Sequence, residues 1–212
     1  MRSIYDKYLN DKIKYEKYQI IGILCLVFVF SGCFGWVYEF IFYYFNGGMK
    51  IWYMQGGNFL PWINIYAFGS LLIVFSTYKI KKNPFFVFLI SSIVTGLLEY
   101  IAGYLLFRLC NGLRLWDYNV EILNFGNING FVCLRSVLFF GFASIILMYF
   151  MLPFLIYISK NMNKKSFIII SISLFTIIMI DELYNLTIAR VAPLPKASEV
   201  YQSMGFKYVK FK

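Results

Sequence analysis

Five long apolar runs determine what this chain can fold into. An α-helix crosses a hydrocarbon core about 30 Å thick with about 20 apolar residues, because each residue adds about 1.5 Å. Each run approaches or exceeds that length, and short polar gaps separate the runs. The sequence therefore predicts an all-α fold, a polytopic bundle of about five transmembrane helices. The predicted spans cover residues 20–45, 60–78, 84–109, 130–159 and 166–191.

The composition excludes most other classes of protein. Hydrophobic residues make up 60% of the chain and charged residues only 14%, whereas soluble domains have about 45–50% and about 25%. A water-soluble protein with so little charge could not cover its surface with polar groups. Soluble enzymes, disordered chains and disulfide-rich secreted modules are excluded. We expect an integral membrane protein whose main partner is the lipid bilayer.

The formal net charge of +10 predicts an orientation. Lysine and arginine concentrate in the N-terminal segment and in the gaps 79–82 and 160–165, whereas the loops 46–59 and 108–129 carry few of them. Positively charged loops stay on the cytoplasmic side. We therefore expect a cytoplasmic N-terminus in a bacterial plasma membrane, and no nucleic-acid partner. Five spans place the basic C-terminus outside, and this conflict would be removed by an extra re-entrant segment or by a fifth span that does not cross the membrane.

The order of the segments predicts the domain organisation. We expect a cytoplasmic interfacial segment at residues 1–19, a transmembrane bundle at 20–191 and a basic tail at 192–212. Each segment differs from the next in hydropathy and in lysine content. The chain is therefore interpreted as one membrane bundle with polar ends.

An internal repeat is visible within the bundle. Residues of about 20–79 and 84–159 both contain a helix, an aromatic loop and a second helix, and the span 166–191 is extra. Glu39 corresponds to Glu99 in this alignment. Two spans per repeat give both repeats the same orientation, as in the parallel repeats of some transporters.

Ionisable residues inside the spans are the first candidates for a site. A charge near the middle of a bilayer costs on the order of 3 kcal/mol, so such residues indicate function. Glu39, Glu99 and Arg135 all fall in the outer half of their predicted spans. The repeat brings the two glutamates toward each other, and we expect Arg135 to act as their counter-charge or to bind an anionic group. The alternative is a structural ion-pair network that fixes the helix register.

The second outer loop adds further candidates. Asp117 lies between two large aromatic residues, which is typical of a lid or a docking element. Asn127 and Asn129 either donate to a ligand or cap the fourth span. The predicted ligand-binding set is Glu39, Glu99, Arg135, Asp117, Trp116, Tyr118, Asn127 and Asn129.

Other polar and aromatic residues have simpler interpretations. The four tryptophans, Trp36, Trp52, Trp62 and Trp116, fit an interfacial aromatic belt. Asp181 and Glu182 are interpreted as the outer end of the last span, which either stops there or continues as an amphipathic turn. We therefore leave this acidic pair outside the candidate site.

The sequence also limits the chemistry. No histidine is present, which removes histidine-dependent triads and metal sites with histidine ligands. We expect no metal and no cofactor. The chain has no GxxxxGK[ST] motif, so any ATP-driven role needs a separate ATPase.

Five ordered motifs resemble those of a known membrane family. They are Gly35-Trp36-x-x-Glu39, Tyr66-x-x-Gly69, Leu98-Glu99-Tyr100-x-x-Gly103, Trp116-Asp117-Tyr118 and Asn127-Ile-Asn-Gly130. The resemblance is to the CmpB-type family, described as "putative ABC-transporter type IV" or "putative ABC transporter permease", and it covers residues of about 30–153. The chain departs from the pattern at Gln55-Gly56, where a basic residue is expected before the glycine. The resemblance implies a permease-like protein and gives no substrate.

Three hypotheses about function follow. The first is a permease-like or solute- or ion-binding transport component with a polar pocket in its outer half. It would act as a homodimer, or with a partner membrane subunit or an ATPase. The second is a membrane-embedded enzyme acting on lipid or envelope precursors, against which stand the missing histidine and the lack of an activated nucleophile. The third is a structural accessory subunit of a membrane complex.

Overall fold

A computed structural model describes residues 2–46, 58–192 and 194–205. Within these ranges the chain forms helices and loops and no strand, which confirms the all-α prediction. The chain divides into two compact units. The first unit comprises Met1–Lys12 and Gly69–Pro153, and the second comprises Ile13–Phe68 and Phe154–Val209. Each unit is described by itself below.

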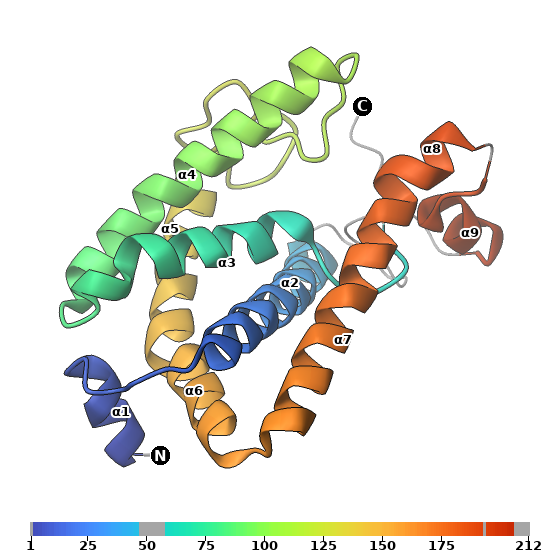
Figure 1. Ribbon diagram of the computed structural model, residues 1–212. Coiled ribbons are helices and arrows are strands. Elements are labelled where there is room, and N and C mark those ends of the chain that lie inside the picture. Colours follow the sequence, from blue (N-terminus) through green and yellow to red (C-terminus); the bar gives the residue numbers. More distant parts are fainter. Residues whose placement is uncertain (1, 47–57, 193, 206–212) are drawn as a thin grey trace. The chain divides into compact units, whose positions relative to one another are not determined.

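The first unit is built around two long helices, α4 (Pro84–Leu109) and α5 (Leu134–Ile146). Asn83 starts α4: its side-chain oxygen accepts hydrogen bonds from the backbone N–H groups of Phe85 and Phe86, at 3.1 and 3.4 Å. Pro84 at the first helical position needs no such acceptor. The loop between α4 and α5 lies against the C-terminal half of α4 (Figure 1).

Shorter helices complete the first unit. Helix α1 (Arg2–Leu9) precedes the long helices, and α5 continues into the π-helical turn η2 (Leu147–Met151). Within the described residues the first unit ends at Pro153, so most of α6 (Leu152–Asn161), which follows η2, belongs to the second unit. The C-terminal part of α3 (Asn64–Thr77) leads through a 3-10 turn at Tyr78–Ile80 into α4.

Small residues let α4 and α5 approach each other closely. A Cβ atom on Gly96 would lie 2.9 Å from Val137, and one on Gly103 would lie 2.9 Å from Phe131. Helices in lipid associate through such small residues, since backbones can then pack together. The side of α4 that carries Glu99 therefore lies along a tight helix–helix seam.

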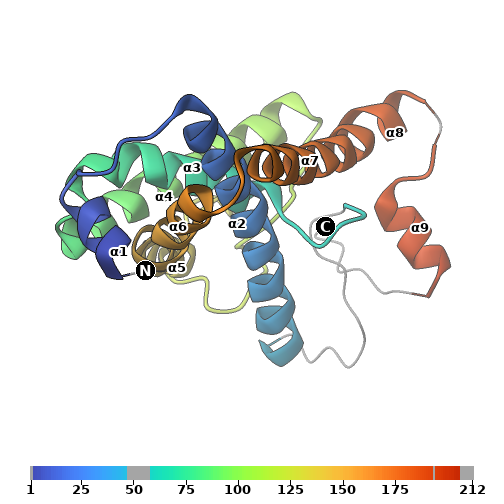
Figure 2. The same ribbon diagram turned by 60° about the horizontal axis from the view of Figure 1, so that its bottom comes forward.

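The second unit contains α2 (Lys17–Asn46), the first turn of α3, and α7 (Lys164–Leu183). Helices α2 and α7 pack together: a Cβ on Gly22 would lie 2.4 Å from the Phe167 ring, and Phe28 packs edge-on against Phe175. The π-helical turn η3 (Tyr184–Ile188) extends α7 into α8 (Ala189–Val191). Helix α9 (Ala197–Ser203) lies on a separate axis (Figure 2).

Within the described residues, four helices are long and apolar enough to cross a membrane, which makes this a multi-pass membrane protein. They are Lys17–Phe45, Pro84–Leu109, Leu134–Asn161 and Lys164–Ile188. The predicted span 60–78 forms α3, whose 14 residues extend about 21 Å, less than the hydrocarbon thickness of about 30 Å. The prediction of about five spans is therefore met by four full-length helices and one short one.

Candidate functional site

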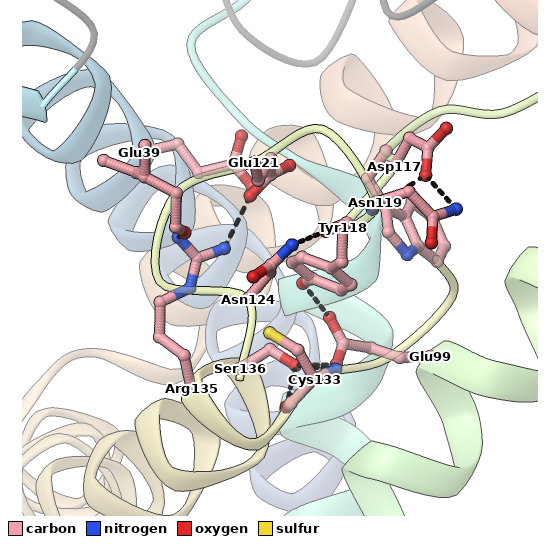
Figure 3. Close-up of polar contacts among 12 residues, drawn as sticks. Glu39, Glu99, Asp117, Tyr118, Asn119, Glu121, Asn124, Cys133, Arg135 and Ser136 are labelled. Carbon is pink, nitrogen blue, oxygen red and sulfur yellow. Dashed lines mark hydrogen bonds and ion pairs between the residues drawn. The ribbon is translucent and has the colours of Figure 1, made fainter. Parts of the chain in front are cut away.

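Glu99 is the centre of the candidate site. It lies on α4 with only 3% of its surface exposed. Its Oε1 atom accepts a hydrogen bond from the Tyr118 hydroxyl at 2.8 Å, and its Oε2 atom lies 2.6 Å from the Ser136 hydroxyl. Figure 3 shows these two side chains directed at Glu99, one from the loop and one from the first turn of α5. The carboxyl group is therefore held by neutral hydroxyls from two other segments.

Tyr118 is a buried loop residue. Burial raises the pKa of its phenol well above the ordinary value, and the neighbouring Glu99 raises it further. The phenol therefore keeps its proton and acts as a hydrogen-bond donor to the carboxylate. The prediction placed Tyr118 in the site, and the structure brings it to Glu99.

Arg135 is paired with a loop residue that the sequence analysis did not select. Its Nη2 atom lies 2.5 Å from Glu121 Oε2, and its Nη1 atom donates to the carbonyl of Ile122 at 3.1 Å. The guanidinium carbon lies 5.4 Å from the centre of the Tyr118 ring. Glu121 lies in the loop 108–129, fourteen positions before Arg135, and no helical or strand spacing relates the two residues. The role of Arg135 as counter-charge to a glutamate of the spans stays a prediction.

Asp117 organises the loop that carries Tyr118. Its Oδ1 atom accepts from the backbone N–H of Asn119 at 3.0 Å and from the Asn119 side chain at 2.8 Å, and Arg114 lies 3.3 Å away. The Trp116 indole N–H donates to the carbonyl of Phe131 at 2.8 Å. Trp116 and Asp117 thus fix the loop, while Tyr118 reaches the carboxyl group.

Asn127 and Asn129 also hold the loop together. The Asn127 amide donates to Asn119 Oδ1 at 2.9 Å and accepts from the Gly130 N–H at 2.9 Å. Asn129 donates to the Tyr100 hydroxyl at 3.2 Å. The capping alternative is wrong, because Cys133 occupies the N-cap position of α5. Whether either amide also contacts a ligand stays a prediction.

Glu39 lies on α2, in the second unit. Its Oε1 atom accepts a hydrogen bond from the Tyr66 hydroxyl at 3.0 Å. Glu39 and Glu99 therefore each receive a hydrogen bond from a tyrosine of their own unit. The expected approach of Glu39 to Glu99 and Arg135 joins the two units and stays a prediction, as does the internal repeat.

Asp181 is a buried anchor within the second unit. Its Oδ1 atom accepts from the Phe59 N–H at 3.0 Å and from the Asn185 amide at 2.9 Å. Its Oδ2 atom accepts from the Leu60 N–H at 2.8 Å and from the Trp62 indole at 3.3 Å. Asp181 lies in the last turn of α7, and the helix continues beyond it through η3, so of the two alternatives the span continues rather than stops. Trp62 is fully buried, so it is not part of an interfacial belt.

Glu182 is buried beside Asp181. Its two carboxylate oxygens accept hydrogen bonds from Asn58, at 3.2 Å, and from Asn64, at 2.8 Å. Asn58 and Asn64 lie on either side of Trp62 in the sequence and are visible there as polar residues beside an apolar run. No local pattern predicts that they bind an acid more than a hundred positions away. Trp52 and Gln55-Gly56 lie outside the described residues. Within the described part of the chain, no group of three or more acidic or cysteine residues is placed to hold a metal ion.

The fold and the buried carboxyl group define a class: a multi-pass α-helical membrane protein with a buried glutamate on one of its long apolar helices. The chain belongs to the family described as "Putative ABC-transporter type IV", whose model matches residues 26–186, well over half of the 212 residues. The match confirms the resemblance carried by the five motifs and relates the chain to membrane transport. No curated protein and no solved structure gave a significant match.

Proposed function

We propose that this protein is a permease-like component of a membrane transport system, in which Glu99 takes up and releases a proton as part of the transport cycle. The observation that carries the proposal is the burial of Glu99 on a spanning helix with two hydroxyls as its hydrogen-bond partners. A carboxyl group held in this way forms no ion pair within the described part of the chain. It can change its charge without breaking a salt bridge.

A count of hydrogens supports a proton on Glu99. The Ser136 hydroxyl has one hydrogen, yet it lies 2.6 Å from Glu99 Oε2 and 2.9 Å from the carbonyl oxygen of Cys133. The carbonyl has no hydrogen to give, so one hydroxyl hydrogen cannot serve both contacts. A protonated Glu99 supplies the second hydrogen, because its own O–H then donates to Ser136. The geometry thus accommodates the neutral carboxylic acid.

The loop provides the means to open the site. Tyr118 lies on the loop that Asp117 and Trp116 fix, and its hydroxyl covers Glu99. Displacement of this loop removes one hydroxyl and admits water to the carboxyl group, which favours the charged form. Arg135 and Glu121 join the same loop to α5 through their ion pair. Their separation would accompany the opening.

The remaining parts of the proposal concern location and partners. The lysine distribution supports a cytoplasmic N-terminus in the plasma membrane, with Glu99 in the outer half of its helix. A chain without GxxxxGK[ST] would obtain energy from a separate ATPase or from an ion gradient. A second copy or a partner subunit would complete the permeation path.

The test uses purified protein in liposomes that contain a pH-sensitive dye. An imposed membrane potential should acidify wild-type vesicles faster than protein-free vesicles, and Glu99→Gln should abolish the difference. Glu16→Gln is the matched control, because Glu16 is exposed and its carboxylate lies 3.9 Å from the Lys164 ammonium, a long contact. Unchanged proton flux in a folded Glu99→Gln variant would show that the carboxyl group is scaffolding.

A further inference from the structure

A row of buried hydroxyls continues from Glu99 along α4. Ser91, Thr95 and Glu99 are spaced by four residues, so they lie on one face of the helix. Ser92 lies beside them, seven residues before Glu99. Ser91 and Thr95 are 0% exposed and Ser92 is 6% exposed. A polar row about 12 Å long therefore extends from Glu99 toward the beginning of α4.

Helix α5 has a glycine, Gly141, where it faces this row. A Cβ atom on Gly141 would lie 2.3 Å from the Ser92 hydroxyl oxygen, so Ser92 fills the space where α5 lacks a side chain. Ser144, one turn further along α5, is fully buried and donates to the carbonyl of Gly141 at 2.6 Å. The hydroxyls of the two helices therefore gather at one level of the α4–α5 seam.

Two of these hydroxyls differ from the other buried serines and threonines of the described helices. Thr95 donates to the carbonyl of Ser91 at 2.7 Å, and Ser171 on α7 donates to its own helix in the same way. Such bonds are the usual solution for a hydroxyl inside a helix. The hydroxyls of Ser91 and Ser92 are buried, and no described residue is their hydrogen-bond partner. Buried hydroxyls of this kind are normally satisfied by ordered water.

We infer that the α4–α5 seam binds water at Ser91 and Ser92, and that this water forms a proton path between Glu99 and the inner half of the helix pair. The inference rests on the proposed proton exchange at Glu99 and deepens it. Ser92 lies about 10 Å from Glu99 along α4, so the path needs a chain of waters along the row rather than a single one. In each step one O–H bond breaks and another forms: Glu99 passes its proton to the first water, and each oxygen of the chain then releases a different proton to the next. Each hydroxyl accepts one proton and gives up one, so no other reactant is needed.

The surroundings favour water over a larger ligand or a metal ion. The Phe88 ring lies against Gly141 beside Ser92, since a Cβ on Gly141 would come within 2.7 Å of it. The donors at this level are neutral hydroxyls, and the carboxyl group of Glu99 begins about 10 Å further along α4. Water fits such a narrow site with hydroxyl partners, whereas metal ions prefer several charged oxygen ligands.

The experiment compares Ser91→Ala, Ser92→Ala and the double variant with the wild type in the liposome assay. The double variant should lose most of the proton flux while its melting temperature is unchanged or raised. A purely structural role predicts the opposite flux result, because removal of an unpartnered buried hydroxyl is neutral or stabilising and leaves function intact. Ser173→Ala, at an exposed serine of α7, is the matched control and should keep wild-type flux.

The outcomes separate this inference from the proposed function. If Glu99→Gln abolishes flux and the double serine variant retains it, the water path is overturned and the role of Glu99 stands. If the wild type conducts no protons, or Glu99→Gln conducts normally, both are overturned. A high-resolution map in lipid nanodiscs gives an independent readout: density is expected within hydrogen-bond distance of both serine oxygens, and a dry seam would overturn the path.

Discussion

The Tyr118 hydroxyl lies 2.8 Å from Glu99 Oε1, so a loop side chain is hydrogen-bonded to a carboxyl group on a spanning helix. Two hydrogen bonds fix the loop around Tyr118: the Asn119 N–H donates to the Asp117 side chain, and the Trp116 indole donates to the Phe131 carbonyl. The one hydrogen bond from Tyr118 therefore couples the position of the loop to the environment of the Glu99 carboxyl group.

Removal of that hydroxyl should weaken the coupling. Tyr118→Phe keeps the ring but leaves Glu99 with one hydroxyl partner, and the loss of one such bond costs about 1–3 kcal/mol. We expect a lower melting temperature and an altered pH dependence of proton flux. Tyr184→Phe is the control, because it removes a comparable bond, to the Pro195 carbonyl at 2.9 Å, in the other unit. Equal flux profiles for Tyr118→Phe and the wild type would contradict the coupling.

The tight seam predicts different effects of alanine at two helical glycines. At Gly141 a new Cβ would meet Ser92 at 2.3 Å and Phe88 at 2.7 Å, and such overpacking costs about 1–3 kcal/mol. At Gly69 the nearest atom would be 3.4 Å away, an ordinary contact. Thermal unfolding in detergent should show Gly141→Ala destabilised and Gly69→Ala tolerated. The opposite order would mean that the seam is not packed as described.

Alanine variants of two loop glycines, Gly112 and Gly130, distinguish the effect of backbone strain from that of a steric clash. Gly112 and Gly130 both have positive φ, +79° and +77°, so alanine is strained at either position, by about 1–2 kcal/mol. Only at Gly130 would the new Cβ also fall within 2.5 Å of Asp117 and Asn119. Gly130→Ala should therefore lower the melting temperature more than Gly112→Ala does. A similar loss for both variants would show that the polar contacts around Gly130 give way easily.

Asp181 accepts several hydrogen bonds in the second unit, so its removal should reduce the stability of the protein strongly. Asp181→Ala leaves the half-buried N–H groups of Phe59 and Leu60 without their acceptor, and an unsatisfied group costs up to about 1–3 kcal/mol when it is buried. We expect Asp181→Ala to destabilise the protein strongly and to increase amide hydrogen exchange at residues 58–62. Asp6→Ala, at an exposed acid of α1, should leave both measurements unchanged.

An acid-sensitive contact holds α1 in the first unit. The Lys81 ammonium bonds to Asp11 and lies 3.9 Å from the centre of the Tyr78 ring, and the bond to Lys81 lowers the pKa of Asp11. A lowered pKa means that the contact stabilises the fold above the ordinary aspartate value, about 3.9, and is lost as the pH falls through the lower value. Hydrogen exchange of α1, corrected for the intrinsic pH dependence, should rise only in acid. In Asp11→Asn it should already be raised at neutral pH.

Much of the architecture follows from hydropathy and helical spacing. The run 84–109 was predicted to the residue, because Asn83 and Pro84 are strong start signals and the apolar pattern continues to Leu109. Gly96 and Gly103 lie three and four residues from Glu99, so helical spacing places them on its side of α4. Helical periodicity places such residues correctly since it depends only on local geometry.

Contacts between distant segments could not be predicted in this way. Glu121 contacts Arg135 because the loop folds back to the start of α5. The conformation of such a loop cannot be derived from a repeating pattern of apolar residues. The short length of α3 has the same origin: Asp181 binds the N–H groups of Phe59 and Leu60, so the helix begins later than its apolar run. In a sequence, an acid near the end of an apolar run indicates the end of a membrane span. The sequence does not distinguish an acid that faces water from one that binds another segment of the chain.

The bond from Leu60 to Asp181 spans 121 positions of the chain, and this sets an order for biosynthesis. At about 5–20 residues per second, a ribosome makes Asp181 roughly ten seconds after Leu60. During this interval the segment before α3 has no aspartate to bind, and its exposed backbone must be tolerated by the translocon or by lipid headgroups. Final closure of the second unit therefore waits for the last long helix to enter the membrane.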